Sequence, residues 1–288
     1  MTAADVIFLS PHLDDAALSC GGAIARLVSE GARVTVVTVF TADQPAGQPL
    51  SPLARRAHAS WDVGDQPFAA RRDEDSAAMQ LLGAQAECLG MLDAIYRRSA
   101  SGEPLYADPL SSPAASDIEL FLPQLVAALQ AAALGTNAGA RVFCPESTGG
   151  HVDHTLVRQA AEQIVDAERI VYYSEYPYSA RPGVSASGPG DSEAFALHTI
   201  ALTSEELEAR IGAVACYVSQ LRGLFPSEVE RLREIAVARI PVVGRHLARP
   251  ADVAASRDRM AAAIRSDVAT QGGERYWWPR SAHSPFSA

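Results

Sequence analysis

The sequence predicts one α/β domain, in which helices cover both faces of a mostly parallel β-sheet. Its 288 residues are 48% hydrophobic, which is enough to form a sizeable core. Short β-branched runs alternate with segments of helical spacing, as they do in βαβ units. No internal repeat and no clear change in composition marks a boundary, so we expect residues 1–288 to form a single domain.

Five short runs are expected to form strands. The first, VIFL at residues 6–9, is a continuous apolar run of the kind that is buried in a parallel sheet. The second, RVTVVTVF at residues 33–40, is rich in β-branched side chains, which favour strands. Shorter runs at residues 86–89, 141–144 and 169–174 complete the set.

Segments between and after these runs are expected to form helices. They lie at residues 21–30, 69–82, 117–133, 155–166 and 204–224. Gly31 and Gly83 fit the ends of the first two helices, because glycine is favoured just after a helix. Ser204, followed by Glu205 and Glu206, is expected to cap the last helix. The order of strands and helices indicates a Rossmann-like arrangement.

Three segments interrupt this pattern and are expected to be loops. They are residues 41–68, 98–116 and 178–193, which are rich in Pro, Gly, Gln or Ser. Long loops in α/β enzymes usually form the rim of a site, so we expect substrate preference to depend on them. The aromatic group Tyr276, Trp277 and Trp278 is expected to pack on the core rather than to line a pocket.

Composition and charge disfavour several classes of function. The formal charge of −10 argues against nucleic acid or an anionic membrane as a partner. No apolar stretch approaches the ~20 residues of a membrane-spanning helix, and the first residues do not resemble a signal peptide. The four cysteines form no CxxC pair, which favours reduced thiols in a cytoplasmic protein. All 24 basic residues are arginine, so the chain has no lysine for a Schiff base or a Walker-type phosphate site.

A cluster of polar residues follows the first expected strand, in SPHLDDAALSCGG at residues 10–22. His12 and Asp15 stand three positions apart, so a turn that enters a helix can direct both side chains to one side. The carboxylates of Asp14 and Asp15 repel each other when buried, and a bound cation would relieve that repulsion and leave one of them as a base for water. The alternative is that both aspartates only cap the following helix.

A second cluster, GGHVDH at residues 149–154, follows the expected strand at 141–144. His151 and His154 are again three positions apart at a strand-to-helix turn. The carboxyl ends of parallel strands meet at one edge of a sheet, so the two clusters can meet in space. One histidine here would complete a set of two histidines and one aspartate, and catalytic zinc commonly takes three protein ligands and a water. The alternative is a chance pair of surface histidines.

The two clusters together resemble the LmbE-like, or PIG-L, family of zinc-dependent deacetylases. That family includes GlcNAc-PI de-N-acetylase and the deacetylases of mycothiol and bacillithiol synthesis. Its first motif, Pro/Ala-His-Pro-Asp-Asp-Glu, is similar to PHLDDA at 11–16, and its His-x-Asp-His motif matches HVDH at 151–154. Weaker matches are Gly21-Gly22, Arg71, Glu74, Ala78, Leu82, Gly83, Tyr217, Ser219 and Gln220, so the resemblance runs from about residue 5 to about residue 223.

This resemblance implies a metal site and a reaction. His12, Asp15 and His154 would bind Zn²⁺, with Fe²⁺ as the other candidate metal. Asp14 would be the general base that takes a proton from the attacking water. The chain would then be a metal-dependent hydrolase that removes an N-acyl group, most simply acetyl, from an amino sugar or a related small molecule.

Four further residues have roles that the resemblance implies. A protonated His151 would lie beside the developing oxyanion, and Asp153 would orient it. Arg71 and Asp93 would face a polar substrate, although an arginine in such a position is also often a surface ion-pair partner. The expected partner is the small-molecule N-acyl substrate, and the sequence leaves the oligomeric state open.

Two departures from the family pattern put the inherited substrate preference in doubt. Ala16 stands where the family usually has glutamate, and Leu13 stands where it has proline. Neither residue is a predicted ligand or base. The missing glutamate is expected to remove a charge near the mouth of the site.

Three alternatives to sugar deacetylation follow from the same residues. One is an amidase that acts on a thiol conjugate or another natural-product amide, which the sequence does not separate from a sugar deacetylase. Another is a metal-dependent glycosyltransferase, which would not need the paired histidines. The third is a binding module without catalysis. Against it, the three expected metal ligands, the expected base Asp14 and His151 are all present.

Overall fold

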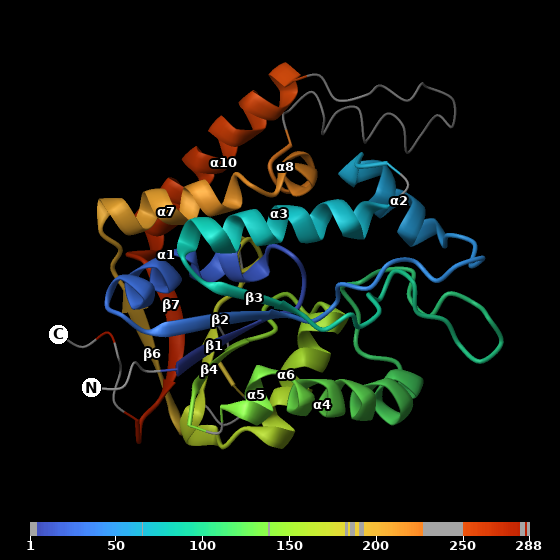
Figure 1. The fold of residues 1–288 in the computed structure, drawn as a ribbon, viewed down its shortest axis with the longest axis horizontal. Helices are drawn as coiled ribbons and strands as arrows, with labels where there is room; N and C mark the ends of the chain where they lie inside the picture. Colours follow the sequence, from blue (N-terminus) through green and yellow to red (C-terminus); the bar gives the residue numbers. More distant parts are fainter. Residues whose placement is uncertain are drawn as a thin grey trace.

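The sheet confirms the predicted α/β class. The computed structural model describes residues 5–64, 66–137, 139–181, 184, 188–189, 193–226, 250–282 and 286. Within these residues, seven strands form one sheet in the order β3-β2-β1-β4-β5-β7-β6 (Figure 1). The strands are β1 (Asp5–Ser10), β2 (Arg33–Thr38), β3 (Gln85–Cys88), β4 (Arg141–Pro145), β5 (Ile170–Tyr173), β6 (Phe195–Ile200) and β7 (Glu274–Pro279). From β3 to β5 all neighbours are parallel, and β7 is antiparallel to both β5 and β6.

Helices cover the sheet on two sides. They are α1 (Asp15–Ser29), α2 (Pro52–Trp61), α3 (Pro67–Leu82), α4 (Leu122–Ala131), α5 (Ala133–Thr136), α6 (Val152–Ile164), α7 (Ser204–Val214), α8 (Val218–Leu224) and α10 (Pro250–Gln271). Figure 1 shows α1, α3, α7, α8 and α10 on one face and α4, α5 and α6 on the other. None of the described helices has both the length and the apolar character that crossing a bilayer requires.

Strand β1 shows how the core is divided between the two faces. Val6 and Phe8 pack into the cluster with α1 and α7, whereas Ile7 and Leu9 pack into the cluster with α4 and α6. This alternation follows from the two-residue period of a strand. Both faces are therefore buried, which explains why the sequence of β1 is a continuous apolar run.

The expected loop at 41–68 is wrong in part, because it contains α2 and the start of α3. Pro52 and Pro67 occupy the first positions of these helices, where the missing N–H of proline costs nothing. Ser51 caps α2 by accepting a hydrogen bond from the N–H of Ala54. Residues 98–114 do form the expected loop. Within 178–193, a short 3₁₀ turn spans Tyr178–Ala180, and several later residues lie outside the described ranges.

The long helix expected at 204–224 is two helices, α7 and α8. The break comes at Tyr217, whose buried hydroxyl donates to Asp75 of α3 at 2.7 Å. The cap of α7 is Thr203 rather than Ser204, and Thr203 forms a reciprocal capping box with Glu206. The predicted single helix is thus divided near a residue that contacts α3, and its predicted cap is displaced by one position.

The sheet also contains β6 and β7, which the sequence pattern did not reveal. Tyr276 and Trp278 of β7 are buried, which confirms that this aromatic group packs on the core. Trp278 and Phe143 of β4 are in edge-to-face contact, with ring centroids 5.9 Å apart. Strand β7 is antiparallel to both of its neighbours, and among the described residues only a 3₁₀ turn lies between β5 and β6, so this part of the sheet departs from the βαβ pattern.

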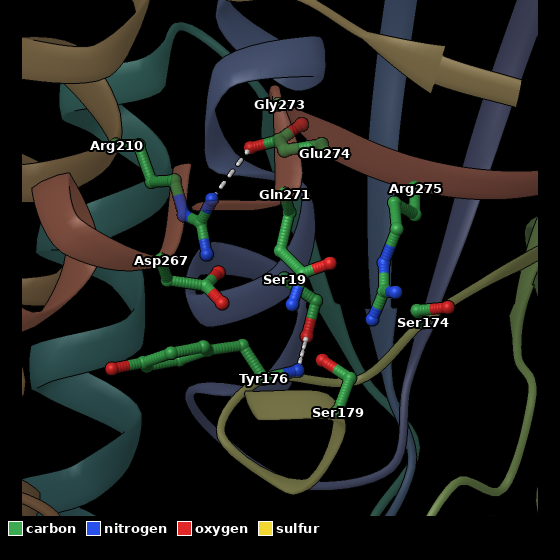
Figure 2. A pocket seen from close by; sticks show the side chains of 10 residues that line it. All are labelled: Ser19, Ser174, Tyr176, Ser179, Arg210, Asp267, Gln271, Gly273, Glu274 and Arg275. Carbon is green, nitrogen blue, oxygen red and sulfur yellow. Dashed lines mark hydrogen bonds and ion pairs between the residues drawn. The ribbon is translucent and has the colours of Figure 1, made fainter. Parts of the chain in front are cut away.

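The glycine pair Gly21-Gly22 lies within α1 and serves packing. A Cβ on Gly21 would lie 2.9 Å from the side chain of Arg210, so only glycine allows α7 to approach this closely. The carboxylate of Glu274 accepts hydrogen bonds from the N–H groups of Gly22 and Ala23, each at 2.9 Å. Figure 2 shows Arg210 and Glu274 meeting at the edge of a polar cavity of about 10 Å³, roughly the space of one water. We infer that these contacts stabilise the fold.

Candidate metal centre

The two polar clusters meet at the carboxyl ends of β1 and β4, which are adjacent parallel strands in the middle of the sheet. From β1 the chain continues to β2 on one side, whereas β4 and β5 lie on the other. Open α/β sheets bind ligands at such a switch point. One ligand atom from each of His12, Asp15 and His154 lies within 4.8 Å of the other two. The structure therefore brings the three predicted metal ligands together.

His12 lies in the turn after β1 and is held through both ring nitrogens. Its Nδ1 is 3.2 Å from Oδ2 of Asp15, and its backbone N–H donates to the same oxygen at 2.8 Å. Its Nε2 is 3.0 Å from Oδ2 of Asp153. A proton shared between Nε2 and Asp153 leaves the lone pair of Nδ1 directed at Asp15, which suits a metal ligand.

His154 lies in the first turn of α6 and is fully buried. Its Nδ1 is 3.0 Å from Oε1 of Glu175, and its Nε2 is 3.3 Å from Oδ2 of Asp15. This Nε2 is buried without a hydrogen-bond partner among the described residues. Although burial opposes it, Asp15 and Glu175 raise the pKa of His154 to about 9. An unpartnered imidazole nitrogen facing a carboxylate fits a divalent cation, which would replace the proton there.

Glu175 is the main contact that the sequence prediction missed. Its carboxylate is fully buried and accepts hydrogen bonds from the N–H groups of Ser147 at 2.9 Å and Thr148 at 2.8 Å. It thereby fixes the turn after β4 and, through Nδ1, the orientation of His154. The available signal was its position just after the run RIVYYS, because an acid at the carboxyl end of a parallel strand lies at the same edge as the two clusters.

Asp14 lies beside the metal ligands and is buried. Its Oδ1 is 3.7 Å from Nη2 of Arg71. Burial and the neighbouring charge of Asp15 raise the pKa of Asp14 to about 7, although Arg71 opposes the shift. A carboxylate that titrates near neutral pH can both accept and return a proton, which is what a general base and acid requires.

His151 packs against both histidine ligands, with ring centroids 4.8 Å from His12 and 4.9 Å from His154. Its Nδ1 accepts a hydrogen bond from the backbone N–H of Asp153 at 3.2 Å. Burial and the charges of His12 and His154 lower the pKa of His151 well below its usual value. These effects disfavour the expected protonated form of His151, and because Nδ1 accepts a hydrogen bond, a neutral ring carries its proton on Nε2.

The hydrogen bonds of the Asp153 carboxylate go to residues other than His151. Its Oδ2 contacts His12, and its Oδ1 is 2.6 Å from Nη2 of Arg97. Arg97 in turn pairs with Asp117, with Nε 2.8 Å from Oδ2. His12, His151 and Asp153 also lie within 4.8 Å of one another, but the ion pair with Arg97 makes this second group a poorer metal site. No local pattern marks Arg97 or Asp117, since both act through contacts distant in sequence.

Arg71 and Asp93 lie next to the metal ligands. The buried guanidinium of Arg71 stands over the ring of Trp61, 4.5 Å from its centroid. Oδ2 of Asp93 is 3.7 Å from Nε2 of His12, and its Oδ1 accepts from the N–H of Ile95 at 3.0 Å. Arg71 is therefore not a surface residue, and both side chains line one cavity.

A cavity of about 220 Å³ opens over these residues. His12, Asp14, Asp15, Arg71, Asp93, His151 and Gln220 form its polar lining. Leu53, Ala57 and Trp61 of α2 and Leu224 of α8 form an apolar wall. Part of the expected rim is thus a helix rather than a loop. Ala16 is 1% exposed and packs in the core, so the departure at this position is not at the mouth of the site as expected.

Comparison with known proteins gives matches to deacetylases. Residues 7–165 match the family described as PIG-L, GlcNAc-PI de-N-acetylase. The 2'-N-acetylparomamine deacetylase of Niallia circulans is 32% identical over 188 residues, which are 60% of this chain and 66% of that protein. The protein of the same name from Streptomyces fradiae is 35% identical over 182 residues, 61% of this chain and 58% of that protein. The chain thus spans less than two thirds of the length of either relative.

Solved structures of two further deacetylases resemble this fold over nearly the whole chain. The zinc-inhibited form of teicoplanin deacetylase Orf2 matches with a TM-score of 0.69 and 26% identity, and the match covers 95% of this chain and 97% of that one. The A40926 pseudoaglycone deacetylase Dbv21 matches with a TM-score of 0.59 and 25% identity, over 98% of both chains.

Proposed function

This chain belongs to the PIG-L family of GlcNAc-PI de-N-acetylases. On that basis we propose that it is a metal-dependent hydrolase that removes an N-acetyl group from an amino sugar. The observation that carries the proposal is the convergence of His12, Asp15 and His154 from the ends of two parallel strands, with Asp14 beside them. Relatives named for the deacetylation of N-acetylparomamine and of teicoplanin support a natural-product substrate of this class.

Three side-chain atoms would hold the metal: Nδ1 of His12, Oδ2 of Asp15 and Nε2 of His154. Two imidazoles and one carboxylate form a donor set that catalytic zinc uses, with the fourth position left to water. We assign Zn²⁺ on the basis of this donor set, with Fe²⁺ as the competing metal. One structural relative is described in a zinc-inhibited form. When bound, the cation supplies Lewis acidity and lowers the pKa of water toward ~7.

The protein residues around the metal would move the protons and bind the charge. Asp14 accepts the proton of the water that attacks the amide carbonyl, and later returns it to the leaving amine. His151, neutral and protonated on Nε2, donates a hydrogen bond to the oxyanion as it develops. Arg71 and Asp93 bind the polar groups of the sugar at the floor of the cavity.

A metal-dependence assay tests this function. The purified chain is analysed for metal and supplied with 2'-N-acetylparomamine, N-acetylglucosamine and an N-acylated thiol–sugar conjugate, and acetate and free amine are measured. We expect one zinc per chain and release of acetate from an N-acetyl amino sugar. A chelator should abolish the release, and limiting zinc should restore it.

Three outcomes would redirect the proposal. Full activity of metal-free protein would overturn the metal assignment. Hydrolysis of the thiol conjugate alone would favour the amidase alternative. Binding of a nucleotide sugar without any amide hydrolysis would favour a glycosyltransferase.

A further inference from the structure

Three residues outside the predicted site form a hydrogen-bonded chain that ends at the cavity. Glu74 lies in α3, and Ser219 and Gln220 lie in the first turn of α8. Ser219 donates twice to the Glu74 carboxylate, through its N–H at 2.9 Å and its hydroxyl at 2.6 Å. Nε2 of Gln220 donates to the same hydroxyl oxygen at 2.8 Å. Gln220 also lines the cavity over the metal ligands.

The chemistry of these bonds fixes the orientation of the Gln220 amide. A serine hydroxyl has one proton, and here that proton goes to the Glu74 carboxylate. The Ser219 oxygen can then only accept, so it must face the NH₂ group of Gln220 and not its carbonyl oxygen. Rotating the amide by half a turn would place two acceptor oxygens against each other. The carbonyl oxygen of Gln220 is therefore directed away from Ser219.

That carbonyl oxygen, Oε1 of Gln220, has no hydrogen-bond donor in the part of the chain that the structure describes. This atom is not among the fully buried polar atoms that lack a partner. The residue is only 9% exposed, so the freedom of its side chain to move is small. A fixed acceptor in a cavity wall is suited to a ligand that brings the donor.

We propose that Gln220 is a substrate-contact residue whose Oε1 accepts a hydrogen bond from a hydroxyl or ammonium group of the sugar. Ser219 and Glu74 are positioning residues that hold the amide in this orientation. The inference rests on the proposed function and deepens it. The cavity then presents acceptors from Asp14, Asp93 and Gln220 to the donors of an amino sugar, while α2 offers an apolar wall to its less polar face.

Two pairs of variants test the inference in the zinc-loaded protein with 2'-N-acetylparomamine as the probe. Gln220→Met keeps the length and volume of the side chain but removes the acceptor. We expect KM to rise about threefold to tenfold and kcat to change by less than about twofold. The reason is that the lost hydrogen bond is made equally in the ground state and the transition state. Val218→Ala, at an exposed position on the same helix, is the matched control and should change neither constant.

The second pair tests the positioning role. Ser219→Ala frees the amide to rotate, so KM should rise by about twofold to threefold, less than in Gln220→Met. Ser219→Thr keeps the hydroxyl and should restore KM to the value of the unaltered protein. Thermal unfolding of each variant separates these effects from loss of folded protein.

The outcomes distinguish this inference from the proposed function. If the unaltered protein hydrolyses the probe but Gln220→Met leaves KM unchanged, or Ser219→Thr fails to restore it, the inference is overturned and the function stands. If the unaltered protein binds the probe without turnover, the same comparison is made on Kd by calorimetry. If it neither binds nor hydrolyses the probe, the proposed function fails for this substrate class and the inference fails with it.

Discussion

The two strand-to-helix turns that form the metal site are held in different ways. The turn after β1 has several hydrogen bonds among its own residues. The hydroxyl of Ser10 donates to the carbonyl of His12 at 2.7 Å and accepts the N–H of Ala16 at 3.1 Å, and the N–H of His12 donates to Asp15. All of these bonds join residues at most six positions apart. In addition, the N–H groups of Val39 and Phe40 donate to the carbonyls of Ser10 and Pro11.

The turn after β4 depends on a residue from another strand. Ser147 and Thr148 donate their N–H groups to Glu175, which follows β5. The same carboxylate contacts His154. A turn with several local hydrogen bonds should tolerate the loss of one. In the second turn one distant carboxylate accepts two backbone N–H groups and also contacts the metal ligand His154, so its loss should matter more. We therefore expect the second turn to be the more sensitive half of the site.

Removing the ligand of the second turn is expected to have the largest effect. His154→Ala should abolish stoichiometric zinc binding and reduce hydrolysis to background, because two protein ligands remain of three. Metal analysis after dialysis and the acetate assay measure this. His198→Ala, at an exposed position in β6, is the control. Full zinc occupancy in His154→Ala would show that the two turns do not share one ion, and the comparison would lose its basis.

Asp14→Asn should separate chemistry from metal binding. We expect turnover to fall by about 10²–10⁴ because the base is lost, while zinc stays bound. Retained turnover would remove Asp14 from the mechanism.

The same variant has a readout that does not depend on activity. Burial and Asp15 raise the pKa of Asp14 in the folded chain from 3.8 to about 7, so folding favours its protonated form. In the metal-free protein this contribution to stability is complete below pH 3.8 and is lost as the pH rises to about 7. Asparagine does not titrate, so Asp14→Asn should not lose this stability as the pH rises. The unfolding temperature of the variant should therefore increase relative to that of the unaltered protein between pH 3.8 and about 7.

Glu175→Gln tests the distant support of the second turn directly. We expect zinc affinity to fall by about 10- to 100-fold, because the amide no longer holds the Nδ1 proton of His154 as a carboxylate does. Turnover at saturating zinc should change far less than the affinity. Zinc Kd from competition with a chelator measures the effect, and Glu162→Gln, an exposed acid of α6, is the control. An unchanged Kd would mean that Glu175 only supports the fold.

The same difference between the turns explains what the sequence could predict. The ligands were predictable because each pair stands three positions apart at the end of a strand. Glu175 orients a histidine 21 positions away, and Arg97 contacts a carboxylate 56 positions away, so no local spacing reveals either contact. The Pro, Gly and Gln content of residues 41–68 favours a loop and hides helix α2, because proline at the first position also begins helices.

Ser10→Ala is expected to have the smallest effect on the site. The change removes two hydrogen bonds of a side chain that is 1% exposed, so the free energy of unfolding should fall by about 1–3 kcal/mol. The bond from the His12 N–H to Asp15 remains, so zinc Kd should stay within about threefold of the unaltered value, well below the change in Glu175→Gln. Chemical denaturation and the chelator competition are run on both variants, with Ser256→Ala as a buried serine outside the site. If Ser10→Ala weakens zinc as much as Glu175→Gln does, the first turn is not held by its remaining local bonds, and the two halves of the site depend equally on single contacts.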